Sequence, residues 1–466
     1  MSRHYTISPG KFDIEFAPSE RATVHGGQLA LAALFEQFGL WKKVAACDAL
    51  DPRAQKTKGY DAQVYVAAIL FSLTSGGDSL ADAERLNEDE ALKATLGIKR
   101  FPDQSAIGEW LRQIGWAGVG ALRELNRAFV AWALQQCDKR VVSYLGALET
   151  FFDDTQIEVD GKCFEGAKLN YEGKVALSWQ TFWAGPFLAD GILGSPSLTK
   201  EPASSAVVGD DVSAYLPHML EANRELWTGW ETYFYADSAS SAGKYLEAVN
   251  REFGNWSISY NKWTGPLEKL CENLGESFWS APEETKWRNG TQHVAQYAFV
   301  RHQPEGCEHP QVFAAVRHKE SGGLGFWEYA FVACKDLPEL ASAKRVFERH
   351  RLKGDKERFF SEVLSDLDLH HPPCKRLDPN NSYYLLAAFA FNALQALKLL
   401  HLPAEHHPKR IKTLIHHLLL IPVEIKRHAR KLKAVFFAPA GWLDWWKGFL
   451  AELLPRCRQL GTVRGT

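Results

Sequence analysis

The sequence predicts a mixed α/β protein in which a central sheet is preceded and followed along the chain by helical regions. Apolar residues recur at helical spacing through residues 27–137. Short apolar runs then alternate with helical stretches between residues 148 and 253, a pattern typical of a sheet flanked by helices. Residues 256–335 are rich in aromatic residues and valine, and two of their segments alternate at period two, which predicts further strands.

Residues 1–140 are predicted to form a helical domain. Gly76 and Gly77 end one helix, and Ser79 with Asp82 resembles a capping box that opens the next. Ser105 is the candidate N-cap of the helix that follows. We therefore expect several amphipathic helices before the first strand.

The 466 residues are too many for one ordinary core, so two to four domains are expected. Strands are predicted at 148–159, 176–183, 186–193 and 232–236, which assigns residues 141–255 to the first part of a sheet-containing core. Residues 256–340 are predicted to be a β-rich insertion. Residues 341–400 are expected to complete the core with a long helix, with a buried helix at 383–400. Residues 401–466 are predicted to be a helical, basic C-terminal region.

The composition, 46% hydrophobic and 24% charged, is that of a globular protein. The net charge of −2 does not indicate nucleic-acid binding. Binding depends more on local charge than on net charge, and residues 409–433 hold eight lysines and arginines against one acid. No apolar run is long enough for a membrane span, and residues 1–16 contain no signal-like stretch. Eight scattered cysteines without a CxxC pair are typical of reduced thiols, so a cytoplasmic protein is expected.

Two aspartates stand out by their position on predicted strands. Asp153 follows two phenylalanines, and a carboxylate on a buried strand must be paired, protonated or bound to metal. The alternative is a turn hydrogen bond with Thr155, and Asp154 is an equally placed neighbour. Asp237 ends an apolar run, and ligands of α/β sheets bind outside the carboxyl ends of strands. The alternative for Asp237 is a helix N-cap.

A third acid, Glu357, lies in a predicted long helix. Glu357, Phe360 and Leu364 are spaced at i, i+3 and i+7 and therefore share one helix face. The glutamate is expected at the edge of the core. The alternative is a solvated glutamate in a charged helix.

The order of these acids, with a β-rich segment between the second and third, resembles the DDE transposases of bacterial insertion sequences. The stretches FFDDTQIEVDG and YFYADSASSAGKYLEAV are similar to the first two family motifs. The stretch HRLKGDKERFF resembles the third, whose pattern is tyrosine, two residues, arginine, three residues, glutamate; here these are His350, Lys353 and Glu357. A lysine often found seven residues after the glutamate is replaced by Leu364. FPDQSAIGEWLR, residues 383–400 and residues 409–432 resemble the IS-thirteen-eighty-like branch.

The resemblance implies a ribonuclease-H-like core that holds two Mg²⁺ ions, for which Mn²⁺ can substitute, on Asp153, Asp237 and Glu357. Asp153 would bridge both ions, Asp237 would hold one and Glu357 the other. Ions about 3.5–4 Å apart activate a water and stabilise the leaving oxygen. Asp153 fits the spacing of the first motif, with Asp154 as its competitor. The resemblance also implies strand joining by a 3′-OH, with a hairpin step in relatives that carry a β insertion.

The implied partners are double-stranded DNA, both transposon ends and target, and a second copy of the chain in a dimer. The predicted DNA contacts are His350, Lys353, Lys426, Arg427, Arg430 and Lys431. The first two stand at family positions that touch phosphates, and the basic segment suits phosphate contacts. Arg427, Arg430 and Lys431 are expected on one helix face, with a solvated surface as the alternative.

Tryptophans in or beside the predicted insertion offer rings on which a displaced base could stack, although each also suits a β-domain core. They are Trp256, Trp263, Trp279, Trp287 and Trp327. Two other functions fit the same sequence. One is a domesticated DNA-binding protein that keeps the fold without transposing, and the other is a ribonuclease-H-like nuclease that cleaves without joining strands.

Overall fold

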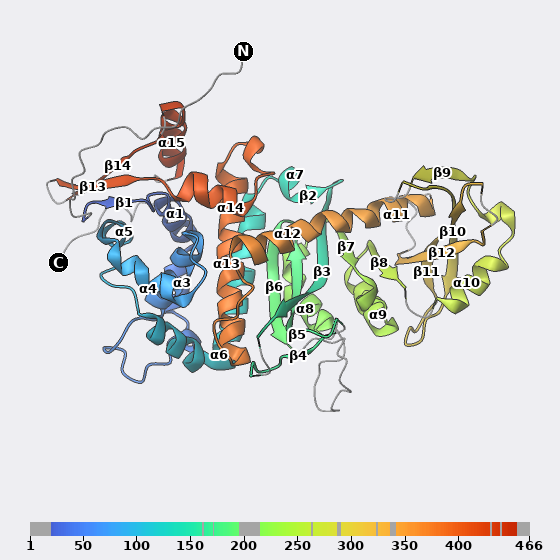
Figure 1. Ribbon diagram of the computed structural model, residues 1–466, viewed down its shortest axis with the longest axis horizontal. Helices are drawn as coiled ribbons and strands as arrows, with labels where there is room; N and C mark the ends of the chain where they lie inside the picture. The colour runs from blue at the N-terminus through green and yellow to red at the C-terminus, as the bar shows by residue number, and fades with distance from the viewer. Residues whose placement is uncertain are drawn as a thin grey trace, which may run out of the picture.

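The computed structural model describes residues 20–160, 163–170, 172–194, 215–261, 264–286, 290–322, 325–335, 342–428, 431–438 and 440–453. The side chains of 355–357, 427–428, 431–432, 440–444 and 452–453 are outside this description. Within these residues a mixed sheet of eleven strands runs through the centre of an elongated molecule (Figure 1). The N-terminal helices lie at one end of the molecule and the aromatic-rich strands at the other.

The region before the sheet is helical, as predicted. Its helices are α1 (Gln28–Phe38), α2 (Leu40–Ala45), α3 (Ala62–Thr74), α4 (Leu80–Arg85), α5 (Glu90–Leu96), α6 (Gln104–Gln136) and α7 (Lys139–Val142). The capping box of Ser79 and Asp82 is confirmed at the start of α4. The prediction of Ser105 as the next N-cap is wrong, because Asp103 lies just outside α6 in an extended conformation and its carboxylate accepts a backbone N–H of the first turn. Gly115, with φ of 52°, interrupts α6.

The predicted strands of the core are confirmed, and they form one continuous section of the sheet. β3 (Ala147–Glu158) pairs antiparallel with β5 (Val175–Ala184), and β5 pairs antiparallel with β6 (Phe187–Gly194). On its other side β3 pairs in parallel with β7 (Thr232–Ala236). The short strands β2 (Ser143–Tyr144) and β4 (Lys168–Leu169) pair with β3 and β5.

The aromatic-rich segment is made of strands, as predicted, but its first strand belongs to the core sheet. Its elements are β8 (Trp256–Tyr260), α10 (Gly265–Glu272), β9 (Glu283–Lys286), β10 (Gln292–His302), β11 (Gln311–Glu320) and β12 (Glu328–Cys334). β8 pairs in parallel with β7 and antiparallel with β12. The order β6-β5-β3-β7-β8-β12-β11-β10-β9 is therefore hydrogen-bonded throughout.

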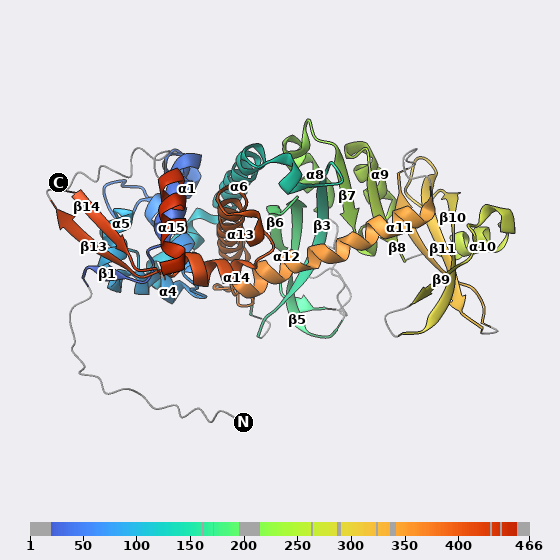
Figure 2. The same cartoon turned by 90° about the horizontal axis from the view of Figure 1, so that it is seen from above.

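Different helices cover the two faces of the sheet (Figure 2). α8 (Leu216–Asn223) and α9 (Gly243–Glu252) lie on one face. On the other face, α11 (Ala343–Arg351), a 3₁₀ turn and α12 (Glu357–Ser361) follow one another across the strands. Phe347 of α11 packs among the apolar residues of β11 and β12, and Phe359 of α12 stacks on Trp183 of β5. The α11–α12 segment thus links the aromatic-rich strands to the core.

The apolar helix predicted at residues 383–400 is confirmed as the buried helix α13 (Leu377–His401). Among the described residues it is the one helix whose length and composition would suit a membrane span, and 89% of its most apolar window is buried inside the protein. Its asparagines bind the outer edge of β6. Asn392 accepts a hydrogen bond from the Leu188 N–H (2.8 Å) and donates one to the Leu188 carbonyl (2.7 Å). Asn381 likewise accepts from the Leu193 N–H and donates to the Leu193 carbonyl.

The prediction of a wholly helical C-terminal region is wrong. After α14 (Ile411–Leu414), β13 (Val423–His428) and β14 (Lys431–Phe436) form an antiparallel pair, which β1 (Ala22–Thr23) extends, before α15 (Ala440–Leu453). Val423 and Ile425 alternate with polar residues and pack with Ala434 and Phe436. Alternation of apolar and polar residues at period two favours a strand over a helix.

Candidate active site

The parallel pairing of β3 with β7 brings two of the predicted acids together. Phe151 is the register partner of Tyr235. Asp153 lies two residues further along β3, and Asp237 lies two residues beyond Tyr235, directly after the end of β7. Side chains two residues apart on a strand share a face, and neighbouring strands are about 4.8 Å apart. Asp153 and Asp237 therefore lie side by side, facing the helix segment α11–α12.

Asp153 is held in a mostly buried position beside one cation. Its Oδ2 lies 3.6 Å from the Nζ of Lys353, and its Oδ1 accepts the Asp154 backbone N–H at 3.0 Å. Burial raises the pKa of Asp153 to about 6, opposed by the ammonium of Lys353 and assisted by the negative charge of Asp237. A carboxylate in this position gains from a cation placed between it and Asp237.

Asp154, the competing first ligand, lies on the opposite face of β3. Its carboxylate accepts hydrogen bonds from the Ser178 hydroxyl and from the Gln156 amide, the latter at 2.6 Å. Burial raises the pKa of Asp154 to about 7, which the two hydrogen bonds oppose. Neutral donors thus surround Asp154, and the α11–α12 segment does not cross its face.

Asp237 directly follows the carboxyl end of β7, the predicted position, and it also has the capping role that was the alternative interpretation. It caps the following 3₁₀ turn (Ser238–Ser240) by accepting the Ala239 N–H at 3.0 Å. This hydrogen bond uses Oδ1 and fixes the carboxylate at the end of the strand. The capping role therefore orients the acid that the family motif singles out.

His350 of α11 is fastened to β8. Its Nδ1 lies 2.9 Å from the Ser257 hydroxyl and its Nε2 2.7 Å from the Ser259 hydroxyl. Burial lowers the pKa of His350 to about 4, assisted by the charge of Lys353. The ring is therefore neutral near pH 7 with both nitrogens engaged, which suits an anchor of α11 better than a phosphate contact. Its role in DNA binding stays a prediction.

Glu357 begins α12, one turn beyond Lys353 and just before the residues that pack on the core. Its side chain is outside the described residues. The backbone there is held on both sides, because Lys353 reaches Asp153 and Phe360 lies against Phe151, with ring centroids 6.2 Å apart. The predicted apolar face is confirmed, since Phe360 and Leu364 are both buried.

Sequence reasoning missed a buried polar group under α11. The Arg349 guanidinium lies 3.8 Å from the centre of the Tyr233 ring and donates to the Tyr235 hydroxyl (3.4 Å), which donates to the buried carboxylate of Glu149 at 2.7 Å. Glu149 and the two tyrosines alternate at period two toward the same face as Asp153. That alternation was the available signal. The group fastens α11 beside the two aspartates.

Three of the four remaining predicted DNA contacts lie on the C-terminal β pair, not on a helix. Lys426 of β13 is exposed, with its Nζ 3.1 Å from Glu424. Arg427 lies on β13 and Lys431 on β14, and Arg430 lies outside the described residues. The expectation that these cations share a helix face is wrong because the segment alternates as strands. Figure 1 shows this pair beyond α13, at the end of the molecule away from the aromatic-rich strands.

The tryptophans of the aromatic-rich segment divide by burial. Trp256 and Trp279 are buried, which confirms a core role for them. Trp327 is half-buried, and Arg317 lies between the Trp279 and Trp327 rings at 4.4 and 4.5 Å from their centres. Trp263 and Trp287 lie outside the described residues.

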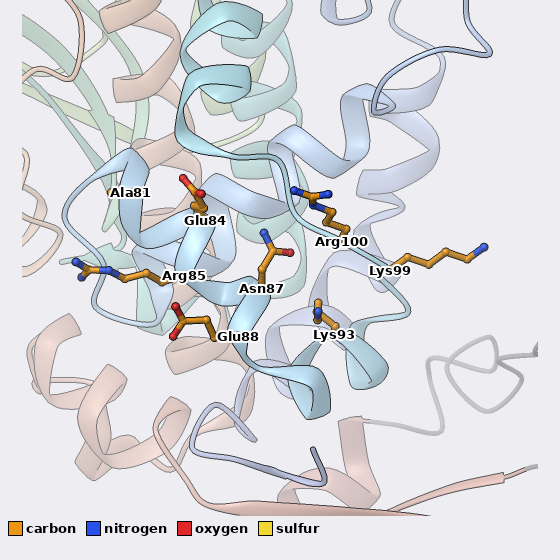
Figure 3. Close-up of a pocket in the computed structure, with 8 residues that line it drawn as sticks. All are labelled: Ala81, Glu84, Arg85, Asn87, Glu88, Lys93, Lys99 and Arg100. Carbon is orange, nitrogen blue, oxygen red and sulfur yellow. The ribbon is translucent and has the colours of Figure 1, made fainter. Parts of the chain in front are cut away.

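A separate hollow of about 530 Å³ opens in the N-terminal helical region (Figure 3). Arg85 and Lys93 line it but are paired with neighbouring acids, whereas the exposed Lys99 and Arg100 on its rim form no ion pair within the described chain. Glu84 also lines the hollow. Two cations are therefore free to contact an anionic partner at this end of the molecule.

Comparison with known protein families agrees with the site. Residues 17–455 match the family model described as transposase DDE domain group 1. The chain belongs to this family. No curated protein matches the chain closely enough to count as a relative. Membership in the DDE family implies that the protein binds and cleaves DNA. The enzymes of this family generally use divalent metal ions.

The paired aspartates fit a divalent ion. Carboxylate oxygens are the donors that Mg²⁺ and Mn²⁺ prefer. Asp153 and Asp237 present such oxygens side by side. The pKa of Asp153 is raised because burial and the negative charge of Asp237 destabilise its ionised form. The residues present therefore suit the metal dependence of the family.

Proposed function

We propose that the protein is a cut-and-paste transposase of a bacterial insertion sequence, of the IS-thirteen-eighty-like branch. It nicks transposon ends and joins the freed 3′-OH to target DNA. The observation that carries this proposal is the alignment of Asp153 with Asp237 on parallel strands, facing the helix that begins at Glu357. Asp154 is set aside as a ligand because it lies on the other face.

In this proposal, strands β6-β5-β3-β7-β8 form the ribonuclease-H-like core. The core spans residues 141–255 and 341–400, and the insertion predicted at 256–340 lies between its halves, except that its first strand, β8, belongs to the core. Residues 1–140 bind DNA or a second copy of the chain, which the free cations of the hollow in Figure 3 support. The basic strands of residues 401–466 add phosphate contacts.

Asp153, Asp237 and Glu357 would hold two Mg²⁺ ions. Bound there, the ions supply the positive charge that activates a water and stabilises the leaving oxygen. The chain itself fixes the geometry. β3 and β7 set the spacing of the aspartates, and His350 and Arg349 hold α11 against the sheet, so that the helix beginning at Glu357 crosses the same face. Lys353 balances the charge of Asp153 and is near enough to contact a DNA phosphate.

The hairpin intermediate rests on the family resemblance and on the strand-rich segment that precedes Glu357. A dimer that pairs the two transposon ends is part of the same proposal. Each can be tested with the same DNA substrates.

The decisive experiment incubates the full chain with duplex DNA that carries the terminal repeats flanking its gene, in Mg²⁺, and maps nicks, hairpins and joined products. Asp153→Ala, Asp237→Ala and Glu357→Ala should each abolish cleavage. Asp154→Asn on the opposite face and Glu348→Ala, an exposed acid on α11, are matched controls that should cut like the parent.

The outcomes separate the alternatives. Normal cleavage by the three variants would overturn the mechanism. DNA binding without metal-dependent cleavage would indicate a domesticated DNA-binding protein, and cleavage without strand joining would indicate a nuclease unrelated to transposition.

A further inference from the structure

α12 (Glu357–Ser361), the helix that begins at the proposed third metal ligand, has only five residues. Isolated helices shorter than about 12–15 residues are marginal in water, so contacts with the rest of the protein must hold this helix in place. Phe359 and Phe360 supply apolar contacts with the core sheet. Burial of apolar surface is non-directional, so these contacts hold α12 against the sheet without fixing its rotation or its position along its axis.

The turn that follows α12 carries two buried acids. It is a π-helical turn (Glu362–Asp366), a rare form that is frequent at functional sites. The side chains of Glu362 and Asp366, its first and last residues, are only 1% and 3% exposed. Buried carboxylates need cations or hydrogen bonds as partners. Residues 408–412, which end the connection from α13 and begin α14, supply those partners, and Figures 1 and 2 show α14 beside this part of the chain.

Asp366 is bound from two residues of the 408–412 segment. Its Oδ1 accepts from the Arg410 Nη2 at 2.7 Å, and its Oδ2 accepts from the Arg410 Nε at 3.3 Å and from the Lys412 backbone N–H at 3.1 Å. The same guanidinium donates to the carbonyl and hydroxyl oxygens of Ser361, both at 3.3 Å. Arg410 thus connects the last residue of α12 with the end of the π turn, through a planar fork of donors that a lysine does not have.

Glu362 makes a second link to the same segment. Its Oε1 accepts from the Arg358 Nε at 2.8 Å, and its Oε2 accepts the Ile411 backbone N–H at 3.3 Å. Arg358, the residue after Glu357, also donates to the Pro408 carbonyl. Both ends of α12 are therefore bonded to the 408–412 segment.

The 408–412 segment is itself fixed to α13. The buried Lys398 of α13 donates to the Lys409 carbonyl at 3.0 Å. Each of the five residues from 408 to 412 therefore contacts α12, its π turn or α13. Hydrogen bonds are directional, so these contacts set the rotation and axial position of α12 that the apolar packing leaves open.

We propose that Arg410 and Asp366 are positioning residues for Glu357. They set where its carboxylate stands relative to Asp153 and Asp237. The proposal rests on the proposed function, because it takes Glu357 as the third metal ligand, and it extends the site to a part of the chain that follows the core. Arg410 belongs to the basic stretch of the sequence, but its role is to hold α12 and not to contact DNA.

The first test is calcium binding, which needs no cleavage. Arg410→Met keeps an unbranched side chain and removes the donors that bond Asp366 and Ser361. Calorimetric titration of the full chain should show calcium affinity lowered roughly ten- to a hundredfold, the range typical of losing a group that orients a metal ligand. Arg410→Lys keeps the charge and should recover part of the affinity. Arg224→Met breaks a two-point pair with Glu252 on the other face of the sheet and is the matched control, which should bind like the parent.

The second test separates positioning from DNA contact. At saturating end DNA in Mg²⁺, Arg410→Met should nick roughly ten- to a hundredfold more slowly than the parent. Its affinity for the same DNA in EDTA should equal that of the parent. A phosphate contact at Arg410 would give the reverse result, weaker DNA binding with an unchanged rate at saturating DNA.

A double variant separates positioning from loss of the fold. Arg410→Met leaves the buried charge of Asp366 without its partner, and Asp366→Asn removes that charge. If the two residues act as one unit, the double variant should bind calcium no more weakly than either single variant. Denaturant unfolding identifies which variants keep the stability of the parent, and Arg410→Lys takes the place of Arg410→Met if the latter does not fold.

Three results would overturn the proposal. One is a folded Arg410 variant or double variant that binds calcium and nicks like the parent. Another is a loss of DNA affinity with an unchanged rate, and the third is an equal loss of calcium affinity in Arg224→Met. Failure of the parent to cut end DNA would overturn the proposed function alone, because the calcium affinities are measured without cleavage.

Discussion

The two faces of β3 place neighbouring carboxylates in different chemistry. Asp153 meets a second aspartate from β7 and the ammonium of Lys353, under a helix that is fastened to the sheet. Asp154 meets a hydroxyl and an amide, both neutral. Alternation along one strand thus separates a site suited to a cation from a buried acid that is satisfied by hydrogen bonds. The following predictions test that separation.

The largest difference is expected in DNA cleavage. Asp153→Asn should lower the nicking rate by at least about a hundredfold, the size typical of losing one preorganised electrostatic partner. Asp154→Asn should keep the rate within a few-fold, because an amide still bonds with Ser178 and Gln156. Single-turnover nicking of labelled end DNA measures both. Equal losses in the two variants would contradict the assignment by face.

His350, above one face of β3, and Asp154, on the other face, should also respond oppositely to pH. Asp153 acts in the same direction as Asp154, because its pKa is raised too. The pKa of His350 is about 4, below its ordinary value, so the unfolded chain binds more protons between about pH 4 and 6.5 and stability rises with pH there. The pKa of Asp154 is about 7, above its ordinary value, so the folded chain binds more protons between about pH 4 and 7 and stability falls with pH. Each contributes roughly 3–4 kcal/mol across its window, at about 1.4 kcal/mol for each unit of pKa.

Denaturant unfolding in EDTA between pH 4 and 7 checks this pair of slopes. Asp154→Asn should leave a profile that rises more steeply with pH, because the contribution of His350 is less opposed. His350→Gln should leave a falling profile, because the acids Asp153 and Asp154 then dominate. Parallel profiles in the two variants would show that neither group carries the pH dependence.

The smallest effect is expected in metal affinity. Lys353→Met removes the ammonium that lies 3.6 Å from Asp153, which a divalent ion must displace. Calcium, used in place of magnesium to avoid cleavage, should bind about fivefold more tightly, equivalent to about 1 kcal/mol. Calorimetric titration measures the change. Lys344→Met, which breaks a pair with Glu283 on the aromatic-rich segment, is the control and should leave the affinity unaltered.

Much of the fold could be predicted because its local patterns are strong. The strand at residues 232–236 has the bounds predicted from its apolar run, and one of the alternating segments within residues 256–335 is the strand at 292–302. The C-terminal β pair was not predicted, because the alternation of Val423 and Ile425 is short and lies within a segment of 25 residues that holds eight cations. The continuity of the sheet through β8 depends on long-range pairing, which local patterns do not encode.

For the site, the motifs pointed to Asp153 and Asp237, which the register of β3 and β7 places side by side, and the spacing that favoured Asp153 over Asp154 agrees with the face on which each lies. The spacing of the third motif located Lys353 without indicating its contact with Asp153. The engagement of both His350 nitrogens by β8 joins residues more than 90 positions apart, beyond the reach of any local pattern.

The asparagines of α13 affect how readily the molecule aggregates at high protein concentration. The outer edge of a sheet is a template on which another chain can add a strand and begin aggregation. At β6 the backbone groups of Leu188 and Leu193 are already bonded by Asn392 and Asn381. The polar interruptions in an otherwise apolar helix therefore end the sheet, because α13 covers the edge of β6 and its buried amides occupy the backbone groups that another chain would need.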